Sequence, residues 1–72
     1  MEIDQNVLQT LLDSNPRFRM LYEEHIIFEK QLTEYDKKPF LSTQEELEKN
    51  KVKKMKLAGK DAMEKILHTV SN

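Results

Sequence analysis

The sequence predicts an all-α protein: a coiled-coil-like antiparallel helical hairpin with a short additional helix at its N-terminal end. Two prolines and one glycine are the strongest helix breakers in the 72 residues, and so few breaks favour long helices. β-Branched residues are scattered and never alternate with polar residues, so strands have no support. A chain of this length makes one domain at most, and we assign residues 1–72 to a single domain.

The first predicted helix covers about residues 4–13. Four apolar side chains share one of its faces: Val7, Leu8, Leu11 and Leu12. A helix this short is marginally stable alone, so we expect it to pack against the rest of the chain. Its expected position is the open end of the hairpin, close to Ile66, Leu67 and Val70.

The second predicted helix covers about residues 16–36 and carries the clearest pattern. Asn is a preferred N-cap and Pro is well tolerated at the first helical position, so we expect Asn15 to cap this helix and Pro16 to open it. Residues separated by 3, 4, 3, 4 and 3 positions then form the a/d seam of a heptad repeat: Phe18, Leu21, His25, Phe28, Leu32 and Tyr35. Only His25 interrupts the apolar and aromatic character of this seam.

The third predicted helix covers about residues 43–70. Ser42 precedes Glu45 by three residues, which is the spacing of a capping box, and Thr43 with Glu46 is the shifted alternative. The apolar stripe of this helix is weaker than that of the second. Its members are Val52, Gly59, Met63, Ile66 and Val70, with Met55 and Ala62 beside them.

The short connection, residues 37–42, makes the second and third helices antiparallel neighbours. With the turn centred near residue 40, the pairs predicted across the seam are Phe28 with Val52, His25 with Met55, Leu21 with Gly59, and Phe18 with Ala62 or Met63. Glycine costs about 1 kcal/mol relative to alanine inside a helix. We therefore expect Gly59 to be there because it allows a bulky side chain of the opposite helix to approach closely.

Two groups of residues carry a family resemblance. In the first half of the chain they are Asn15-Pro16-Arg17-Phe18, Leu21, His25 and Leu32. In the second half they are Val52-Lys53-Lys54, Lys56-Leu57, Lys60-Asp61 and Ile66-Leu67. Together they span about residues 8–68 and look like the YdcH-like family, small bacterial proteins of unassigned function. The resemblance implies a helical hairpin and implies no activity.

The composition excludes several classes of site. The chain has no cysteine, so disulfides and thiolate metal sites are ruled out. Its start, Met-Glu-Ile-Asp, lacks the basic and apolar segments of a signal peptide, and no stretch approaches the roughly 20 apolar residues of a membrane span. We therefore expect a cytoplasmic protein with no membrane contact. Phosphate-binding glycine loops, nucleophile elbows and metalloprotease pairs are also missing, so we expect no enzymatic activity, metal or cofactor.

The leading functional hypothesis is a protein–protein interaction or structural module. Four apolar residues lie off the predicted seam: Met20, Ile26, Ile27 and Leu57. Either the first helix or a second chain must cover them, and exposed apolar patches mark interaction sites. The partners that we expect are a second copy of the chain or another protein.

The alternative hypothesis is a nucleic-acid-associated protein. Residues 37–72 hold nine bases and five acids, and no acid interrupts residues 49–60. One stripe of the third helix is basic and could follow a phosphate backbone: Lys49, Lys53, Lys56 and Lys60. The competing interpretation is a solvated face partly paired with acids of the facing helix, namely Glu23, Glu24 and Glu29.

His25 is the one candidate for site chemistry. Glu29 lies four residues later on the same helix, and the pair could supply two metal ligands, whereas structural zinc normally takes four. We interpret His25 as a polar residue of the seam whose ring nitrogens bond a carboxylate, the backbone or water, because buried polar groups need partners.

Overall fold

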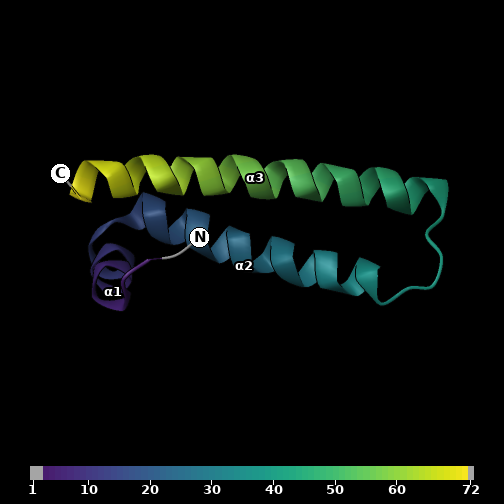
Figure 1. Cartoon of the computed structure of the whole chain (residues 1–72), viewed down its shortest axis with the longest axis horizontal. Helices are drawn as coiled ribbons and strands as arrows, with labels where there is room; N and C mark the ends of the chain where they lie inside the picture. The colour runs from purple at the N-terminus through teal and green to yellow at the C-terminus, as the bar shows by residue number, and fades with distance from the viewer. Residues whose placement is uncertain (1–2, 72) are drawn as a thin grey trace.

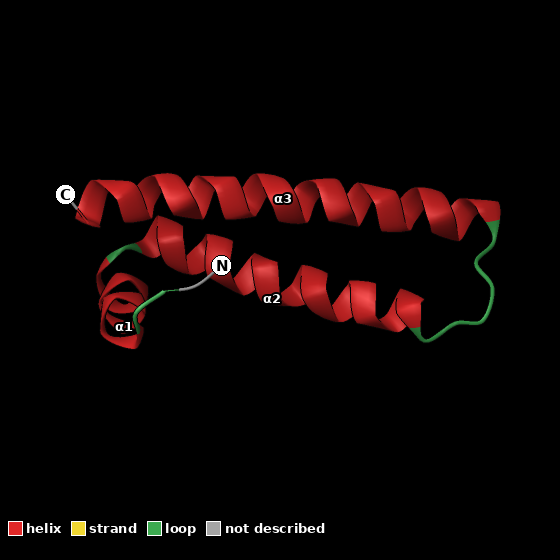
Figure 2. Cartoon of the chain, in the orientation of Figure 1, coloured by secondary structure: helices red, strands yellow, loops and turns green. Residues whose placement is uncertain are grey.

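The computed structural model describes residues 3–71, with side chains described up to Thr69. Within this range the chain forms three helices, α1 (Gln5–Ser14), α2 (Pro16–Asp36) and α3 (Thr43–Ser71). Figure 2 shows helices and loops only in the described part of the chain, so the all-helical prediction is confirmed. The expected ranges were 4–13, 16–36 and 43–70. The side chain of Val70, assigned to the third stripe, lies outside the described residues.

The helices form an elongated molecule of 44 × 19 × 17 Å. Helices α2 and α3 pack side by side in opposite directions, and the connection joins them at one end (Figure 1). Helix α1 packs against α2 at the other end and is seen almost end-on in Figure 1, so it crosses the direction of the hairpin. In the same view α2 approaches α3 near α1 and draws away from it toward the connection.

A single residue, Asn15, separates α1 from α2. Its backbone is extended, with φ −122° and ψ 98°, as expected for a residue that precedes proline. Its N–H donates to the Leu11 carbonyl at 2.8 Å and ends α1. Its side-chain Oδ1 accepts a hydrogen bond from the N–H of Phe18 at 3.0 Å, and Pro16 occupies the first turn. The predicted cap is therefore confirmed.

Ser42 begins α3 through a reciprocal capping box. The N–H of Glu45 donates to Ser42 Oγ, and the N–H of Ser42 donates to Glu45 Oε1, both at 3.1 Å. The structure thus selects Ser42 over Thr43 as the cap. Asp4 caps α1 in a similar way, since its Oδ1 accepts from the N–H of Asn6 at 2.8 Å.

The core lies at the open end of the hairpin, where all three helices contribute. Its buried members are Leu11 of α1, Phe18 and Leu21 of α2, and Met63 of α3. Phe18 and Met63 are 0% exposed. Partly buried side chains pack around this cluster: Ile3, Val7, Leu8, Leu12, Tyr22, Ala62, Ile66 and Leu67. This end therefore supplies most of the apolar burial in the described part of the chain.

Toward the connection the seam is only half covered. His25, Phe28, Leu32 and Tyr35 of α2 are each partly exposed, although Val52 of α3 is buried. Two helices alone cannot enclose the side chains between them, and α1 does not extend this far. The seam thus changes from a closed core to an open groove along its length.

The explanation predicted for Gly59 is wrong. A Cβ added at Gly59 would meet no heavy atom within 4 Å, apart from its chain neighbours and its own helix backbone. No side chain of α2 therefore approaches closely enough to require glycine here. The backbone at this position has a negative φ, so glycine is not needed for conformational reasons either.

Gly59→Ala should stabilise the protein by about 1 kcal/mol, because it removes the entropic cost of glycine inside a helix without creating a clash. Urea unfolding monitored by circular dichroism at one fixed protein concentration measures this change. The matched control is Lys54→Gly at an exposed position of the same helix, which should destabilise by a similar amount. A loss of stability in Gly59→Ala would show that the α2–α3 contact is closer than described.

Candidate functional site

The hairpin has two unlike flanks, one on each side of the α2–α3 seam. The charged flank holds acids of α2 and lysines of α3 around a hollow of about 350 Å³. Lys49 Nζ lies 3.1 Å from Asp36 Oδ1, and Lys56 Nζ lies 3.5 Å from Glu29 Oε1. Both pairs join α2 to α3, so this flank is held by ion pairs between the helices.

These contacts account for half of the predicted basic face. Lys49 and Lys56 are engaged, whereas neither Lys53 nor Lys60 forms an ion pair with any described residue. Among the acids expected to face them, Glu29 does so and Glu23 instead pairs with Arg19 of its own helix at 3.2 Å. The structure therefore supports the interpretation of this stripe as a partly paired face.

His25 lies in the seam beside this flank, and its side chain is 15% exposed. Its Nε2 lies 3.1 Å from Glu29 Oε1, the same carboxylate oxygen that contacts Lys56. Its Nδ1 is buried and has no hydrogen-bond partner among the described residues. One ring nitrogen thus has the carboxylate partner that the sequence suggested and the other does not. Within residues 3–71, no three His, Asp or Glu side chains gather in a way that could hold a metal ion.

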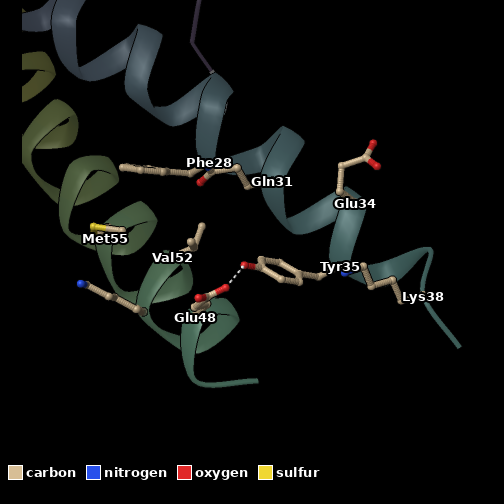
Figure 3. A pocket seen from close by; sticks show the side chains of 9 residues that line it. Phe28, Gln31, Glu34, Tyr35, Lys38, Glu48, Val52 and Met55 are labelled. Atoms are coloured by element: carbon tan, nitrogen blue, oxygen red, sulfur yellow. Dashed lines mark hydrogen bonds between the residues drawn. The ribbon is translucent and has the colours of Figure 1, made fainter. Parts of the chain in front are cut away.

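The opposite flank, which we call the groove flank, is mainly apolar. A groove of about 480 Å³ opens between the helices. Its lining residues are Phe28, Gln31, Glu34 and Tyr35 of α2, Lys38 of the connection, and Glu48, Lys51, Val52 and Met55 of α3. Figure 3 shows the aromatic and aliphatic side chains along its floor and the charged ones around it. An open apolar groove with a charged rim is suited to binding a side chain or helix of another molecule.

Polar contacts close the groove near the connection. Tyr35 donates a hydrogen bond to Glu48 at 3.1 Å, drawn as a dashed line in Figure 3. Partial burial raises the pKa of Tyr35, and the hydrogen bond to Glu48 adds to this effect. Lys38 forms an ion pair with Glu45 and lies 6.0 Å from the centre of the Tyr35 ring. These contacts tie the end of α2 to the start of α3.

The four residues of the predicted interaction surface do not form one patch. Met20 and Ile27 are 50% and 52% exposed, and their spacing places them on the same side of α2 as Gln31 of the groove flank. Ile26 lies about 100° round the axis of α2 from Ile27, and it lines a separate hollow with Ile3 and Leu8. Leu57, 59% exposed, lies about 140° round α3 from Val52 and points away from the seam.

Neither the groove nor the exposure of Phe40, which is 87% exposed in the connection, was predicted from the sequence. One signal could have revealed the groove. A helix of ten residues is about 15 Å long and one of 21 residues is about 32 Å long. The first helix is therefore too short to cover the whole apolar seam of the second, and its far end must remain accessible.

Comparison of the chain with protein-family models, with curated proteins and with solved structures finds no match. None of the described helices has an apolar stretch long enough to cross a membrane.

Glu45→Gln should lower stability at neutral pH and leave it nearly unchanged in acid. The hydrogen bond from Lys38 and the one from the Ser42 N–H hold the pKa of Glu45 below its ordinary value. A depressed pKa contributes stability above the unfolded value, near 4.3 for a glutamate, and this contribution is lost as the pH falls through the folded pKa. Glutamine retains the capping box with Ser42, so the variant removes the charge and the Oε2 acceptor that faces Lys38.

Urea midpoints of wild type and Glu45→Gln at pH 7 and pH 3 measure the effect. The difference between the two proteins should shrink at pH 3, and in a Lys38→Gln background it should be smaller at pH 7 as well. An equal difference at both pH values would contradict the assignment of the stabilisation to the Lys38–Glu45 pair.

His25→Leu should raise the free energy of unfolding by about 1 kcal/mol, because it removes a buried nitrogen that lacks a partner. The lost contact with Glu29 is worth little, since that carboxylate is half exposed and exposed pairs contribute weakly. Urea unfolding at pH 7.5 tests this, with His68→Leu on the exposed surface of α3 as the control. A destabilised His25→Leu variant would mean that the Nδ1 atom has a stabilising partner.

Proposed function

We propose that the chain acts without catalysis, as a protein–protein interaction or structural module that binds its partner along the groove flank. The observation that carries this proposal is the open apolar groove between Phe28 and Tyr35 on α2 and Val52 and Met55 on α3. Large apolar surfaces on a small protein mark interaction sites. Met20 and Ile27 extend the same surface along α2, so two of the four residues predicted from sequence belong to it.

The scaffold suits this role. The heptad spacing of the second helix supports a coiled-coil-like packing with the third, and side chains on a rigid helix pair present a fixed surface at low entropic cost. The resemblance to the YdcH-like family is part of the proposal and rests on residues such as Asn15, Pro16 and Phe18. It supports the hairpin scaffold and adds no activity.

The alternative proposal, nucleic-acid association through the lysines of α3, has weaker support. Within the predicted stripe, Lys49 and Lys56 are already paired with Asp36 and Glu29, which leaves Lys53 and Lys60 of that stripe for phosphate groups. Few charge contacts to phosphate mean weak and strongly salt-dependent binding. The experiment below separates the two proposals.

Ile27→Glu should abolish capture of protein partners in a tagged pull-down from the native cell, because it places a charge in an apolar contact. Ile27 is half exposed, so the variant should fold, and circular dichroism checks that it does. Leu57→Glu is the matched control, since Leu57 is equally exposed but lies away from the groove flank, and it should retain the partners.

The same pull-down is repeated with nuclease. Partners that survive nuclease and depend on Ile27 support the interaction module. Partners that disappear with nuclease and do not depend on Ile27 would favour the nucleic-acid alternative and overturn the leading proposal.

A further inference from the structure

The chain exposes more surface than a compact protein of its size. Its accessible surface is 5582 Å², whereas a folded monomer of 8.6 kDa is expected to expose about 4,700 Å². The excess of about 900 Å² is close to the roughly 800 Å² that each partner buries in a protein interface of standard size. One additional contact of ordinary size would therefore bring the exposed surface to the usual value.

The groove flank carries a second regular stripe on each helix, beside the seam. On α2 its members follow each other by 4, 3, 4 and 3 residues: Met20, Glu24, Ile27, Gln31 and Glu34. On α3 the spacing is 4, 3 and 4: Lys51, Met55, Ala58 and Ala62. Most of these side chains are exposed. Such spacing keeps a stripe facing one neighbouring helix, so each helix of the pair can accept a further helix on this flank.

The charges on the two stripes have opposite signs. Among these residues the α2 stripe contains the acids Glu24 and Glu34 and no base, whereas the α3 stripe contains the base Lys51 and no acid. Lys38 and Glu48 also line the groove, but Glu45 and Tyr35 of the same chain already engage them. Lys51 forms no ion pair with any described residue. Among the described residues, Glu34 forms an ion pair only with Lys37 at the end of the same helix, and both side chains are about two-thirds exposed. A partner that offers an acidic stripe to α3 and a basic stripe to α2 would satisfy both, and another copy of this chain offers that combination.

The oppositely charged and the apolar residues of the two stripes also lie at matching heights along the hairpin. The contacts of Tyr35 with Glu48 and of Asp36 with Lys49 fix which residues of α2 and α3 lie at the same level. Glu34 is then level with residues 49–51 of α3, and Ile27 is level with residues 56–58. A two-fold axis parallel to the helices preserves these levels, because it carries one copy onto the other without a shift along the helices. The α2 helix of each copy then faces the α3 helix of the other.

We propose that the partner bound on the groove flank is a second copy of this chain, in a two-fold dimer in which α2 of each copy packs against α3 of the other. In this four-helix arrangement Ile27 packs near Met55 and Ala58 of the second copy. Glu34 meets Lys51 of the second copy at the rim of the groove. The inference rests on the proposed function and names the partner of the same surface.

Sedimentation of the purified protein at two widely separated concentrations tests the dimer. The expected result is a species of twice the 8.6 kDa chain mass at the higher concentration, with dissociation on dilution. Ile27→Glu should weaken self-association by about tenfold or more, as expected for a central apolar contact, and Leu57→Glu should leave it unchanged. A wild-type protein that remains at 8.6 kDa throughout overturns the dimer, and so does a dimer equally strong in Ile27→Glu.

A charge-reversal pair tests the register between chains. Glu34→Lys places two bases opposite each other in a homodimer, and Lys51→Glu places two acids opposite each other, so each variant alone should associate several-fold more weakly than wild type. An equimolar mixture of the two restores both opposite-charge pairs and should form heterodimers as strong as wild type. Failure of the mixture to associate overturns the proposed pairing.

The two proposals fail separately. A strictly monomeric protein that still captures another protein through Ile27 leaves the interaction module standing and removes the dimer. A dimer that captures nothing further identifies the second copy as the occupant of the groove flank.

Discussion

Two helices packed side by side leave their shared apolar seam open on both flanks, and a third element must add side chains to close it. In this protein α1 packs against α2 at the open end and adds Leu11 to the core there, and its length sets how much of the seam is covered. Where α1 lies, Phe18 and Met63 are completely buried together with Leu11. Beyond α1 the same heptad pattern continues through Phe28 and Tyr35, which remain partly exposed. The groove is therefore a direct consequence of a long hairpin covered by a short helix.

The connection end is held by polar contacts in place of burial. Ser42 and Glu45 exchange hydrogen bonds, Lys38 pairs with Glu45, and Tyr35 bonds Glu48 across the helices. Exposed contacts of this kind each contribute little, but they are directional and fix the register of α2 against α3. The two ends of the hairpin are thus held by different interactions. Apolar burial at the open end stabilises the fold, and polar contacts at the connection fix the position of α2 relative to α3 along the groove.

The uneven charge of the two halves of the chain has different consequences on the two flanks. On the charged flank, acids of α2 meet lysines of α3 within the chain, and the pairs Asp36–Lys49 and Glu29–Lys56 join the helices. On the groove flank the same asymmetry leaves Glu34 and Lys51 without an interhelical partner. Opposite charges on neighbouring stripes make that flank complementary to itself. The asymmetry that suggested a nucleic-acid surface is thus explained equally well by attraction between helices, within one chain or between two.

The sequence by itself determined the helices, their caps and the antiparallel order of α2 and α3. It did not determine the register between them, because the contacts of Tyr35 with Glu48 and of Glu29 with Lys56 place Phe28 level with residues 55–57, about one turn beyond the predicted Val52. Asn15 with Pro16, Ser42 with Glu45, and the 3–4 spacing from Phe18 to Tyr35 are local signals, and local signals depend on residues within one or two turns of each other. Only the tertiary structure decided which apolar residues are covered. It separated Met20 and Ile27 from Ile26 and Leu57, revealed the groove at Val52 and Met55, and showed that Gly59 accommodates no close neighbour. Exposure depends on how far α1 reaches and how α2 diverges from α3, and both are set by contacts between residues distant in the sequence.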